Sequence, residues 1–118
     1  MEKVFESEYR FLCILWEAQP VKSSELVKLC NEKLGWKKST TYTVIKKLIE
    51  KEIVENKDTI VRALVEKEEV DRMQSNELYE TRYKGNIPAF FAAFLQDKKL
   101  TKNDVKKIQK IIEESYEE

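Results

Sequence analysis

The fold is decided by residues 36–48, which read Trp36-Lys37-Lys38-Ser39-Thr40-Thr41-Tyr42-Thr43-Val44-Ile45-Lys46-Lys47-Leu48. At about 100° per residue, a helix built from this stretch has two unlike sides. One side is largely aliphatic and collects Thr41, Val44, Ile45 and Leu48. The other side carries ammonium and hydroxyl groups, from Ser39, Thr43, Lys46 and Lys47. The stretch therefore predicts a helix with a buried face and a polar face that can bond phosphates and base edges.

The segment before this helix predicts a second helix, joined to it by a tight turn. Val21 follows Pro20 as a short extended residue, Ser23 is expected to cap the helix, and Gly35 is expected to end it in the left-handed conformation. The inner face of this helix is apolar and consists of Leu26, Val27, Leu29, Cys30 and Leu34. Two helices joined by a glycine-containing turn, the second with an exposed polar face, are typical of a helix-turn-helix.

A β-hairpin is expected directly after the polar-faced helix. Residues 53–55 and 60–65 are rich in valine and isoleucine, and the polar residues 56–59 lie between them. A hairpin in this place is called a wing.

Before these elements, Ser7 is expected to cap a first helix that runs to about Ala18. We expect Trp16 to belong to the core and Trp36 to pack the turn, because duplex DNA offers no exposed base face.

The charges are balanced overall but unevenly distributed. The chain has 22 Lys and Arg against 22 Asp and Glu, and a neutral chain speaks against nucleic acid because phosphate neutralisation supplies much of the affinity for DNA. Residues 37–51 nevertheless hold five lysines and one glutamate. An isolated cluster of this size is more often a solvated helix face. Its position between a glycine-ended helix and a hairpin favours DNA binding.

The pattern changes to longer helices from residue 66 onward. Residues 67–83 predict a charged helix with a sparse apolar side, Gly85 breaks it, and residues 87–95 predict a nearly apolar helix with Pro88 in its first turn. Thr101 and Asp104 resemble a capping box that opens a last helix. That helix is striped by Val105, Ile108, Ile111 and Ile112.

The apolar helix is too large to be covered by the sparse side of residues 67–83, so we expect another subunit to cover part of it. The residues expected at this dimer contact are Phe90, Phe91, Phe94, Leu95, Val105, Ile108 and Ile112. An intramolecular three-helix core is the alternative, although a lobe of roughly fifty residues buries little surface. The sequence thus predicts a mainly α fold with a small wing, as a winged helix-turn-helix DNA-binding domain over residues 1–66 and a helical dimerisation region over residues 67–118.

Cysteine usage and hydropathy indicate the compartment. Cys13 and Cys30 lie in helical patterns and are expected to be small buried or half-buried thiols in a reducing environment. No apolar run approaches the roughly 18 residues of a membrane span, and the chain does not open on a signal core. We expect a cytoplasmic protein with no stable membrane association.

Enzymatic activity finds little support in the residue types. The chain has no histidine, and its two glycines cannot form a glycine-rich phosphate loop. The carboxylates fall on solvated helix faces. We expect no catalytic residue, no metal site and no cofactor.

An ordered set of segments resembles a known family. The segments are Glu8-Tyr9 with Leu15-Trp16, then Ser23 to Leu26, Trp36 to Leu48, and Gly85 to Leu100 followed by the amphipathic last helix. Together they resemble the penicillinase-repressor family of bacterial regulators, which includes the BlaI and MecI repressors and the CopY-type copper regulators. The resemblance implies a homodimer whose two winged-helix lobes bind double-stranded palindromic operator DNA and block transcription.

The resemblance places DNA contacts in the helix of residues 36–48, on Ser39, Thr40, Tyr42, Thr43 and Lys47. The polar face adds Lys37, Lys38 and Lys46, and the hairpin adds Lys57 and Arg62. Strand alternation can aim Arg62 to either side of the hairpin. Relatives often carry basic residues where this chain has Ser39 and Tyr42, which implies a different operator, because arginine typically reads guanine. Relatives also usually have glycine at Glu52, so we predict a distorted helix end near Lys51 and Glu52.

The resemblance suggests two ways of relieving repression. CopY-type regulators bind metal through a C-terminal cluster of cysteines, but this chain has no cysteine after Cys30, so copper sensing of that kind is not expected. BlaI and MecI repressors are cleaved within the short apolar helix after a membrane sensor-protease detects β-lactams. The matching bond here is Ala93-Phe94, with alanine in place of the family's asparagine before it.

The alternative function is a winged-helix module that docks other proteins and binds no DNA. The winged-helix fold does not by itself imply DNA binding. A net charge of zero also suits a docking module. A docking surface would show exposed aromatic or aliphatic side chains on the polar-faced helix, because the cores of interfaces favour them. Tyr42 fits either function, whereas Lys46, Lys47 and Ser39 favour contact with phosphates.

Overall fold

The computed structural model describes residues 1–117 and divides them into two compact units. The first unit is Met1–Glu77 and the second begins at Leu78. This division falls later in the chain than the one expected after residue 66. The start of α4 (Lys67–Leu78) belongs to the first unit because Val70 is fully buried there and Asp71 accepts a hydrogen bond from the Tyr9 hydroxyl.

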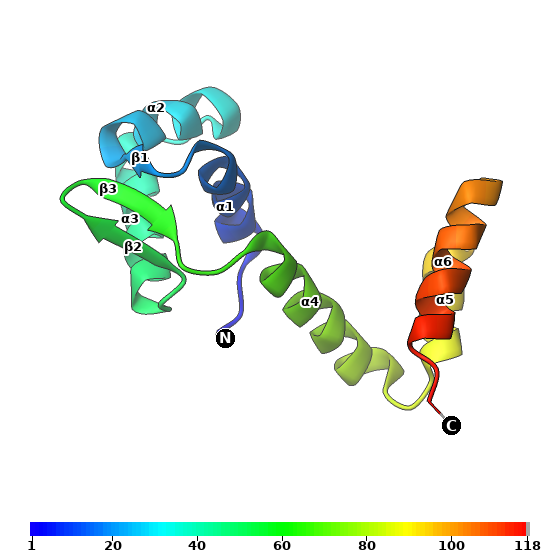
Figure 1. Ribbon diagram of the computed structural model, residues 1–118. Helices are drawn as coiled ribbons and strands as arrows, with labels where there is room; N and C mark the ends of the chain where they lie inside the picture. The colour runs from blue at the N-terminus through cyan, green and yellow to red at the C-terminus, as the bar shows by residue number, and fades with distance from the viewer. Residues whose placement is uncertain (118) are drawn as a thin grey trace. The chain divides into compact units, whose positions relative to one another are not determined.

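The first unit consists of helices around a small antiparallel sheet (Figure 1). Its elements before α4 are α1 (Glu6–Ala18), β1 (Val21–Lys22), α2 (Ser23–Leu34), α3 (Lys38–Glu50), β2 (Val54–Lys57) and β3 (Ile60–Ala63). The strand order is β1-β3-β2, so β3 pairs with both neighbours. The predicted fold class, mainly α with a winged helix-turn-helix, is confirmed.

One core holds the first unit together. Every one of its helices and strands contributes fully buried apolar side chains or nearly buried ones, including Phe11, Leu12, Leu15, Val21, Leu26, Leu48, Val54, Val61 and Val70. Within α3 the buried residues are Thr41, Val44, Ile45 and Leu48, as the helical periodicity predicted. Burial of this aliphatic stripe fixes how α3 is rotated, and so it fixes which side chains face solvent.

Two helix starts differ from the expected caps. Phe5, and not Ser7, precedes α1, and the Glu8 carboxylate accepts from the Phe5 backbone N–H at 2.8 Å. Ser23 is the first residue of α2 rather than its cap, because its N–H is bonded to the Thr59 carbonyl at 2.8 Å. Helix α3 begins at Lys38, within the stretch of residues 36–48 that predicted a helix. The Glu8 carboxylate therefore bonds the start of α1, and the turn of the wing bonds the start of α2, in place of the expected serine caps.

The wing is a hairpin with a two-residue turn, shorter than the expected turn of residues 56–59. Asp58 and Thr59 both have positive φ, at 52° and 67°, as a type I′ turn requires. The sequence did not predict that β1 would join the sheet. Val21 pairs with Val61 and Lys22 with Ile60, so the start of the helix-turn-helix is fastened to the wing.

The predicted distortion at the end of α3 is confirmed. Helix α3 ends at Glu50, Lys51 keeps a right-handed conformation, and Glu52 has φ +62°. The Ile53 N–H then bonds to the Leu48 carbonyl at 3.0 Å. Gly35 ends α2 at φ +70°, also as predicted.

As far as residue 117, the second unit contains one π-helical turn and two helices. They are η1 (Tyr79–Tyr83), α5 (Ile87–Leu95) and α6 (Lys102–Glu114). The helix expected over residues 67–83 is thus α4 followed by η1. Asn86 caps α5 through its side chain, and the predicted capping box of Thr101 and Asp104 opens α6.

Candidate nucleic-acid interface

The polar face of α3 is fully presented to solvent. Lys38, Ser39, Thr40, Thr43, Lys46 and Lys47 are all exposed, and so is Lys37 just before the helix. No ion pair is formed by Lys37, Lys38, Lys46 or Lys47 with any residue in the range 1–117 that the structure describes. Their ammonium groups are therefore available to phosphates without first breaking an ion pair.

The hydroxyl groups of Thr43 and Tyr42 on this face form different contacts within the protein. Thr43 Oγ1 donates to the Ser39 carbonyl at 2.9 Å, which leaves its oxygen lone pairs pointing outward as acceptors. Tyr42 is 37% exposed, and its hydroxyl lies 3.5 Å from Ser23 Oγ at the start of α2. The Lys38 ammonium lies 6.0 Å from the Tyr42 ring centroid. Tyr42 therefore connects the polar face of α3 with the first residue of α2.

The fifth lysine of the basic cluster has a different role. Lys51 Nζ lies 2.7 Å and 3.0 Å from the two carboxylate oxygens of Glu8 and also donates to the Lys3 carbonyl at 2.8 Å. The side chains of Lys51 and Glu8 are only 15% and 4% exposed. Lys51 is therefore a structural cation that joins the end of α3 to α1, and it is not part of the exposed basic face.

The two wing cations are exposed, but they share one carboxylate. Lys57 Nζ lies 3.6 Å from Glu55 Oε2, and Arg62 Nε lies 3.6 Å from Glu55 Oε1. The direction of Arg62 was open from strand alternation alone, and the structure places it on the outer face of the sheet, opposite Glu55. A phosphate that approaches either cation therefore meets an anion already in contact with it.

Lys22 is a further basic residue on this outer face that the sequence analysis missed. It lies opposite Ile60 in the β1–β3 pair, and Ile60 lies opposite Lys57 in the β2–β3 pair. Because cross-strand partners share a face, Lys22 and Lys57 lie on the same side of the sheet. The missing signal was the pairing of β1 with the wing, a contact between residues about forty positions apart that periodicity cannot reveal.

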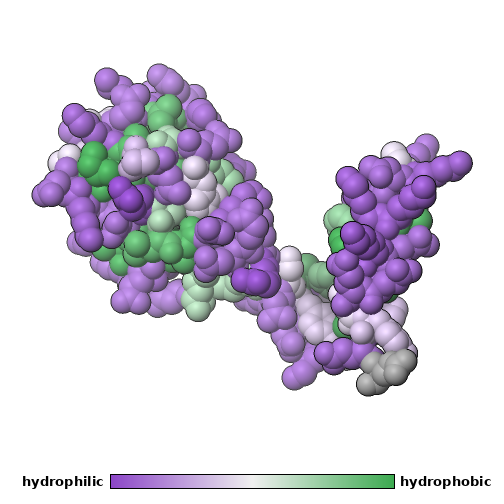
Figure 2. All heavy atoms as spheres, viewed as in Figure 1, coloured by the Kyte–Doolittle hydropathy of each residue, from purple (hydrophilic) through white to green (hydrophobic). Residues whose placement is uncertain are grey.

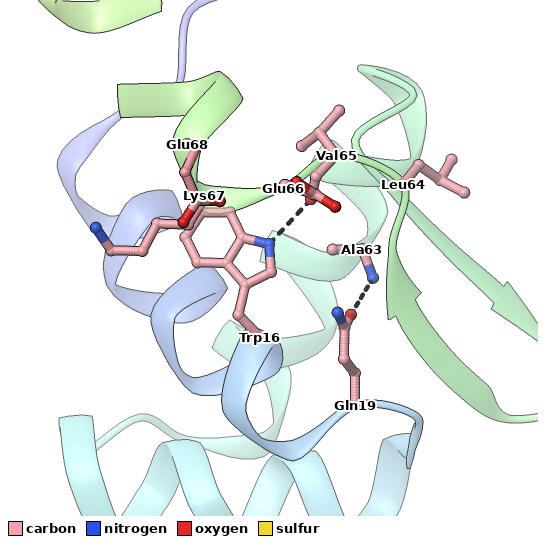
Figure 3. A pocket seen from close by; sticks show the side chains of 8 residues that line it. All are labelled: Trp16, Gln19, Ala63, Leu64, Val65, Glu66, Lys67 and Glu68. Carbon is pink, nitrogen blue, oxygen red and sulfur yellow. Dashed lines mark hydrogen bonds between the residues drawn. The ribbon is translucent and has the colours of Figure 1, made fainter. Parts of the chain in front are cut away.

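Both tryptophans have structural roles, as expected. The Trp36 ring stacks on Phe11 at 6.3 Å between centroids with 1° between the planes. The Trp16 indole N–H donates to the Val65 carbonyl at 3.0 Å, and Gln19 Oε1 accepts from the Ala63 N–H at 2.7 Å (Figure 3). Trp16, Gln19, Ala63 and Val65 are among the residues that line a shallow pocket of about 490 Å³. The two bonds fasten the end of β3 to the end of α1, so the Trp16 indole N–H and Gln19 Oε1 already have partners.

The apolar residues expected at a dimer contact fall into two groups. Phe91, Phe94, Val105 and Ile112 are exposed, with Phe94 at 65%. Phe90, Leu95 and Ile108 are half-buried. The Phe90 ring makes edge-to-face contacts with Tyr79 and Tyr83, with 6.1 Å and 5.4 Å between the ring centroids. Figure 2 shows apolar residues reaching the surface at both edges of the hydrophilic face of the second unit. Ala93, before the expected cleavage bond, is also exposed.

The cysteines are separate thiols. Cys13 is half-buried and Cys30 is buried, and neither forms a disulfide. Burial raises the pKa of both thiols, so the reactive thiolate form is disfavoured. Among residues 1–117, no cluster of three or more side chains suited to a metal ion was found. No helix in that range is both long and apolar enough to cross a bilayer.

These features define a winged helix-turn-helix protein with a basic, hydroxyl-rich third helix. A family model described as penicillinase repressor matches residues 5–114, and the chain therefore belongs to the penicillinase-repressor (BlaI/MecI) family. Members of this family are transcription regulators and not enzymes, and membership implies a DNA-binding repressor.

Comparisons with individual proteins are sparser. No curated protein matches the chain. Among solved structures, the crystal structure of RV1404 from Mycobacterium tuberculosis is similar, with 18% identity and a TM-score of 0.45. That match covers 80% of this chain and 73% of the other.

Proposed function

We propose that this protein represses transcription by binding a palindromic double-stranded operator as a homodimer. The observation that carries the proposal is the polar face of α3, with unpaired lysines at its start and its end and hydroxyls between them. A helix with this face fits the major groove, where lysines meet phosphates and hydroxyls meet base edges. The proposed contacts on α3 and just before it are Lys37, Lys38, Ser39, Thr40, Tyr42, Thr43, Lys46 and Lys47.

The wing and the first strand extend this surface. Lys57 and Arg62 are the proposed wing contacts, and Lys22 joins them from β1. Tyr42 links α3 to Ser23, and the Ser23 N–H bonds to the Thr59 carbonyl in the wing turn. The three elements are thus tied together through α2, which supports a single continuous DNA-binding surface.

Binding to duplex DNA of mixed sequence, measured across a range of salt concentrations, tests the proposal. Repressor-like contact predicts that log affinity falls steeply with log salt, and that Lys46→Ala and Lys47→Ala each flatten the slope by up to about 0.9. Lys106→Ala is the matched control, because Lys106 is an exposed helical lysine of the second unit. Absence of binding at about 50 mM salt would contradict DNA binding and favour a protein-docking module instead.

Footprinting on the DNA upstream of the protein's own gene tests the operator part of the proposal. A homodimer protects two inverted half-sites whose centres lie one helical turn apart or a multiple of it, about 10 base pairs or a multiple. Protection of a single half-site, or of no defined site, would contradict a palindromic operator.

The dimer is proposed to form through the second unit. The exposed side chains of Phe91, Phe94, Val105 and Ile112 support this, because water-exposed apolar groups of this size are stabilised by a partner surface. Within α6, Ile108 alone is half-buried and every other residue is exposed. An amphipathic helix whose apolar stripe is uncovered in a single chain is what a self-association element requires.

Relief of repression is proposed to occur by cleavage at Ala93-Phe94, carried out by a membrane sensor-protease. Both residues are exposed on α5. Mass spectrometry of the protein recovered from its host before and after β-lactam exposure tests this. Two fragments that meet at this bond are expected. A chain that stays intact while its target genes are induced would exclude the mechanism.

A further inference from the structure

The outer face of the wing carries an arrangement of charges that DNA binding alone does not explain. Glu55 on β2 lies directly opposite Arg62 on β3, and Lys57 lies two residues further along β2. Residues that are opposite each other, or two apart on one strand, point to the same side of a sheet. A single carboxylate is therefore placed between the two basic residues of the wing.

The contact distances and exposures show that the carboxylate is held in place. Glu55 Oε1 and Oε2 each lie 3.6 Å from a different cation, Arg62 Nε and Lys57 Nζ. The Glu55 side chain is 26% exposed, against 53% for Arg62 and 80% for Lys57. The anion is thus more enclosed than its partners, and the cations extend past it into solvent, where a phosphate would arrive.

We propose that Glu55 is an intramolecular counter-ion that limits how strongly the wing binds DNA phosphates. The inference rests on the proposed DNA-binding function and adds a residue that sets its strength. Lys57 and Arg62 are partly neutralised by Glu55, so they hold fewer solution anions and attract a phosphate less strongly. The phosphate must displace the carboxylate and is also repelled by it. The lysines of α3 have no such competitor among residues 1–117.

Glu55→Gln tests the inference because it removes the charge and keeps the shape. With duplex DNA of mixed sequence, about three helical turns long, the variant is expected to bind about two- to five-fold more tightly at low salt. Its plot of log affinity against log salt is expected to be steeper by up to about 0.9. Glu55→Thr, which suits a strand, provides a second variant in case the amide perturbs the hairpin.

Double variants distinguish two possible causes of tighter DNA binding. One is the release of Arg62 and Lys57 from Glu55, and the other is a general loss of negative charge. Arg62→Ala is expected to flatten the salt slope less in the wild type than in the Glu55→Gln background. Lys22→Ala is the internal comparison, because Lys22 lies on the same face but forms no ion pair within residues 1–117. Its effect on the slope is expected to be equal in both backgrounds.

Asp58→Asn is the matched control for charge. Asp58 lies in the same hairpin, is exposed, and forms no ion pair with any described residue, and asparagine tolerates its positive φ. It is expected to leave the salt slope unchanged. An Asp58→Asn effect as large as that of Glu55→Gln would overturn the inference, because repulsion alone would then account for the gain. An equal Arg62→Ala effect in both backgrounds would overturn it too.

Failure of the inference can be told apart from failure of the proposed function. If the wild type binds DNA and Glu55→Gln and Glu55→Thr bind no more tightly, Glu55 is not a counter-ion but the repressor function stands. If neither the wild type nor the variants bind at about 50 mM salt, the DNA-binding function itself is contradicted.

Discussion

Glu52 holds a backbone conformation that side chains other than glycine adopt at a cost. Glu52 lies two residues after the end of α3, and its φ of +62° turns the chain toward β2. This conformation costs a non-glycine residue about 1–2 kcal/mol. Glycine avoids that cost, but it also raises the conformational entropy of the unfolded chain, which offsets part of the gain in stability. We expect Glu52→Gly to raise the free energy of unfolding by about 0.5–1 kcal/mol in urea denaturation.

Lys28→Gly is the control for that experiment. Lys28 is an exposed residue inside α2, where glycine is expected to lower the free energy of unfolding by about 1 kcal/mol. Opposite signs at the two positions identify backbone strain as the cause. A loss of stability at both positions would show that Glu52 makes a favourable contribution that exceeds its strain.

The ion pair of Lys51 and Glu8 is the other residue-scale feature with a large expected effect. The Glu8 carboxylate is 4% exposed and depends on Lys51 Nζ at 2.7 Å. Removing one partner of a buried pair leaves the other charge uncompensated. We expect Lys51→Met to lower the free energy of unfolding by about 3 kcal/mol, measured by chemical denaturation.

The double variant Glu8→Leu with Lys51→Met is the matched control for the ion pair. It removes both charges, so it is expected to be clearly more stable than Lys51→Met alone. If the double variant is as unstable as the sum of the two single variants, the charges are independent and the lost stability comes from packing.

At the scale of elements, α4 is attached to α1 by a short polar chain. The Tyr9 hydroxyl donates to Asp71 Oδ1, and Lys67 Nζ donates to Asp71 Oδ2 at 2.7 Å. Hydrogen bonds from Lys67 and then Tyr9 lower the pKa of the Asp71 carboxyl. The hydrogen bond to Asp71 raises the pKa of the Lys67 ammonium and that of the Tyr9 hydroxyl. The stabilising contributions of Asp71, Lys67 and Tyr9 are therefore all present at neutral pH.

The shifted pKa of Asp71 predicts how this attachment responds to acid. Because its folded pKa is lowered, its contribution is present above the unfolded value of about 3.9 and is lost as pH falls through the folded pKa. We expect Asp71→Asn to be less stable than the wild type near pH 7 and the difference to shrink below about pH 4, measured by urea denaturation over a pH series. A constant difference at all pH values would contradict an ionic role for Asp71.

Elements with strong local signals were predictable from the sequence. The buried face of α3, the left-handed end of α2 at Gly35 and the capping box at Thr101 all follow from spacing and residue type within a few positions. The pairing of β1 with β3 and the contact of Lys51 with Glu8 join residues far apart in sequence. They depend on how the elements meet, which local periodicity does not encode.

The candidate site was predictable to a similar extent. The exposure of Ser39, Thr43, Lys46 and Lys47 is confirmed because it follows from the helix period. Lys22 was missed because a two-residue strand leaves almost no pattern. The sharing of Glu55 between Lys57 and Arg62 needed the hairpin register, and the sequence predicted a longer turn and therefore a different register.

For the whole molecule, the proposed dimer makes a prediction about oligomeric state. Phe94 is 65% exposed on α5, and a charge there would have to be desolvated in an apolar subunit contact. We expect Phe94→Asp to sediment as a monomer. Its operator affinity is expected to fall by roughly a hundredfold or more, because two half-sites are no longer engaged together.

Gln96→Asp is the control for added charge in the same segment. Gln96 is an exposed polar residue just after α5, so it is expected to leave the dimer intact. A dimeric Phe94→Asp variant would mean that the contact lies elsewhere on the second unit. Monomers formed by both variants would point to a general effect of charge.

The two faces of α3 are also subject to different evolutionary constraints. Thr41, Val44, Ile45 and Leu48 are bound to the core, so their replacement is limited by folding. Ser39, Lys46 and Lys47 are exposed, and their side chains form no hydrogen bond or ion pair with another element in the described part of the chain, so they can be exchanged with little effect on the scaffold. A paralogue or an engineer could therefore give this repressor a new target by rewriting a few outward positions. Tyr42 would be the exception, because its hydroxyl also reaches α2.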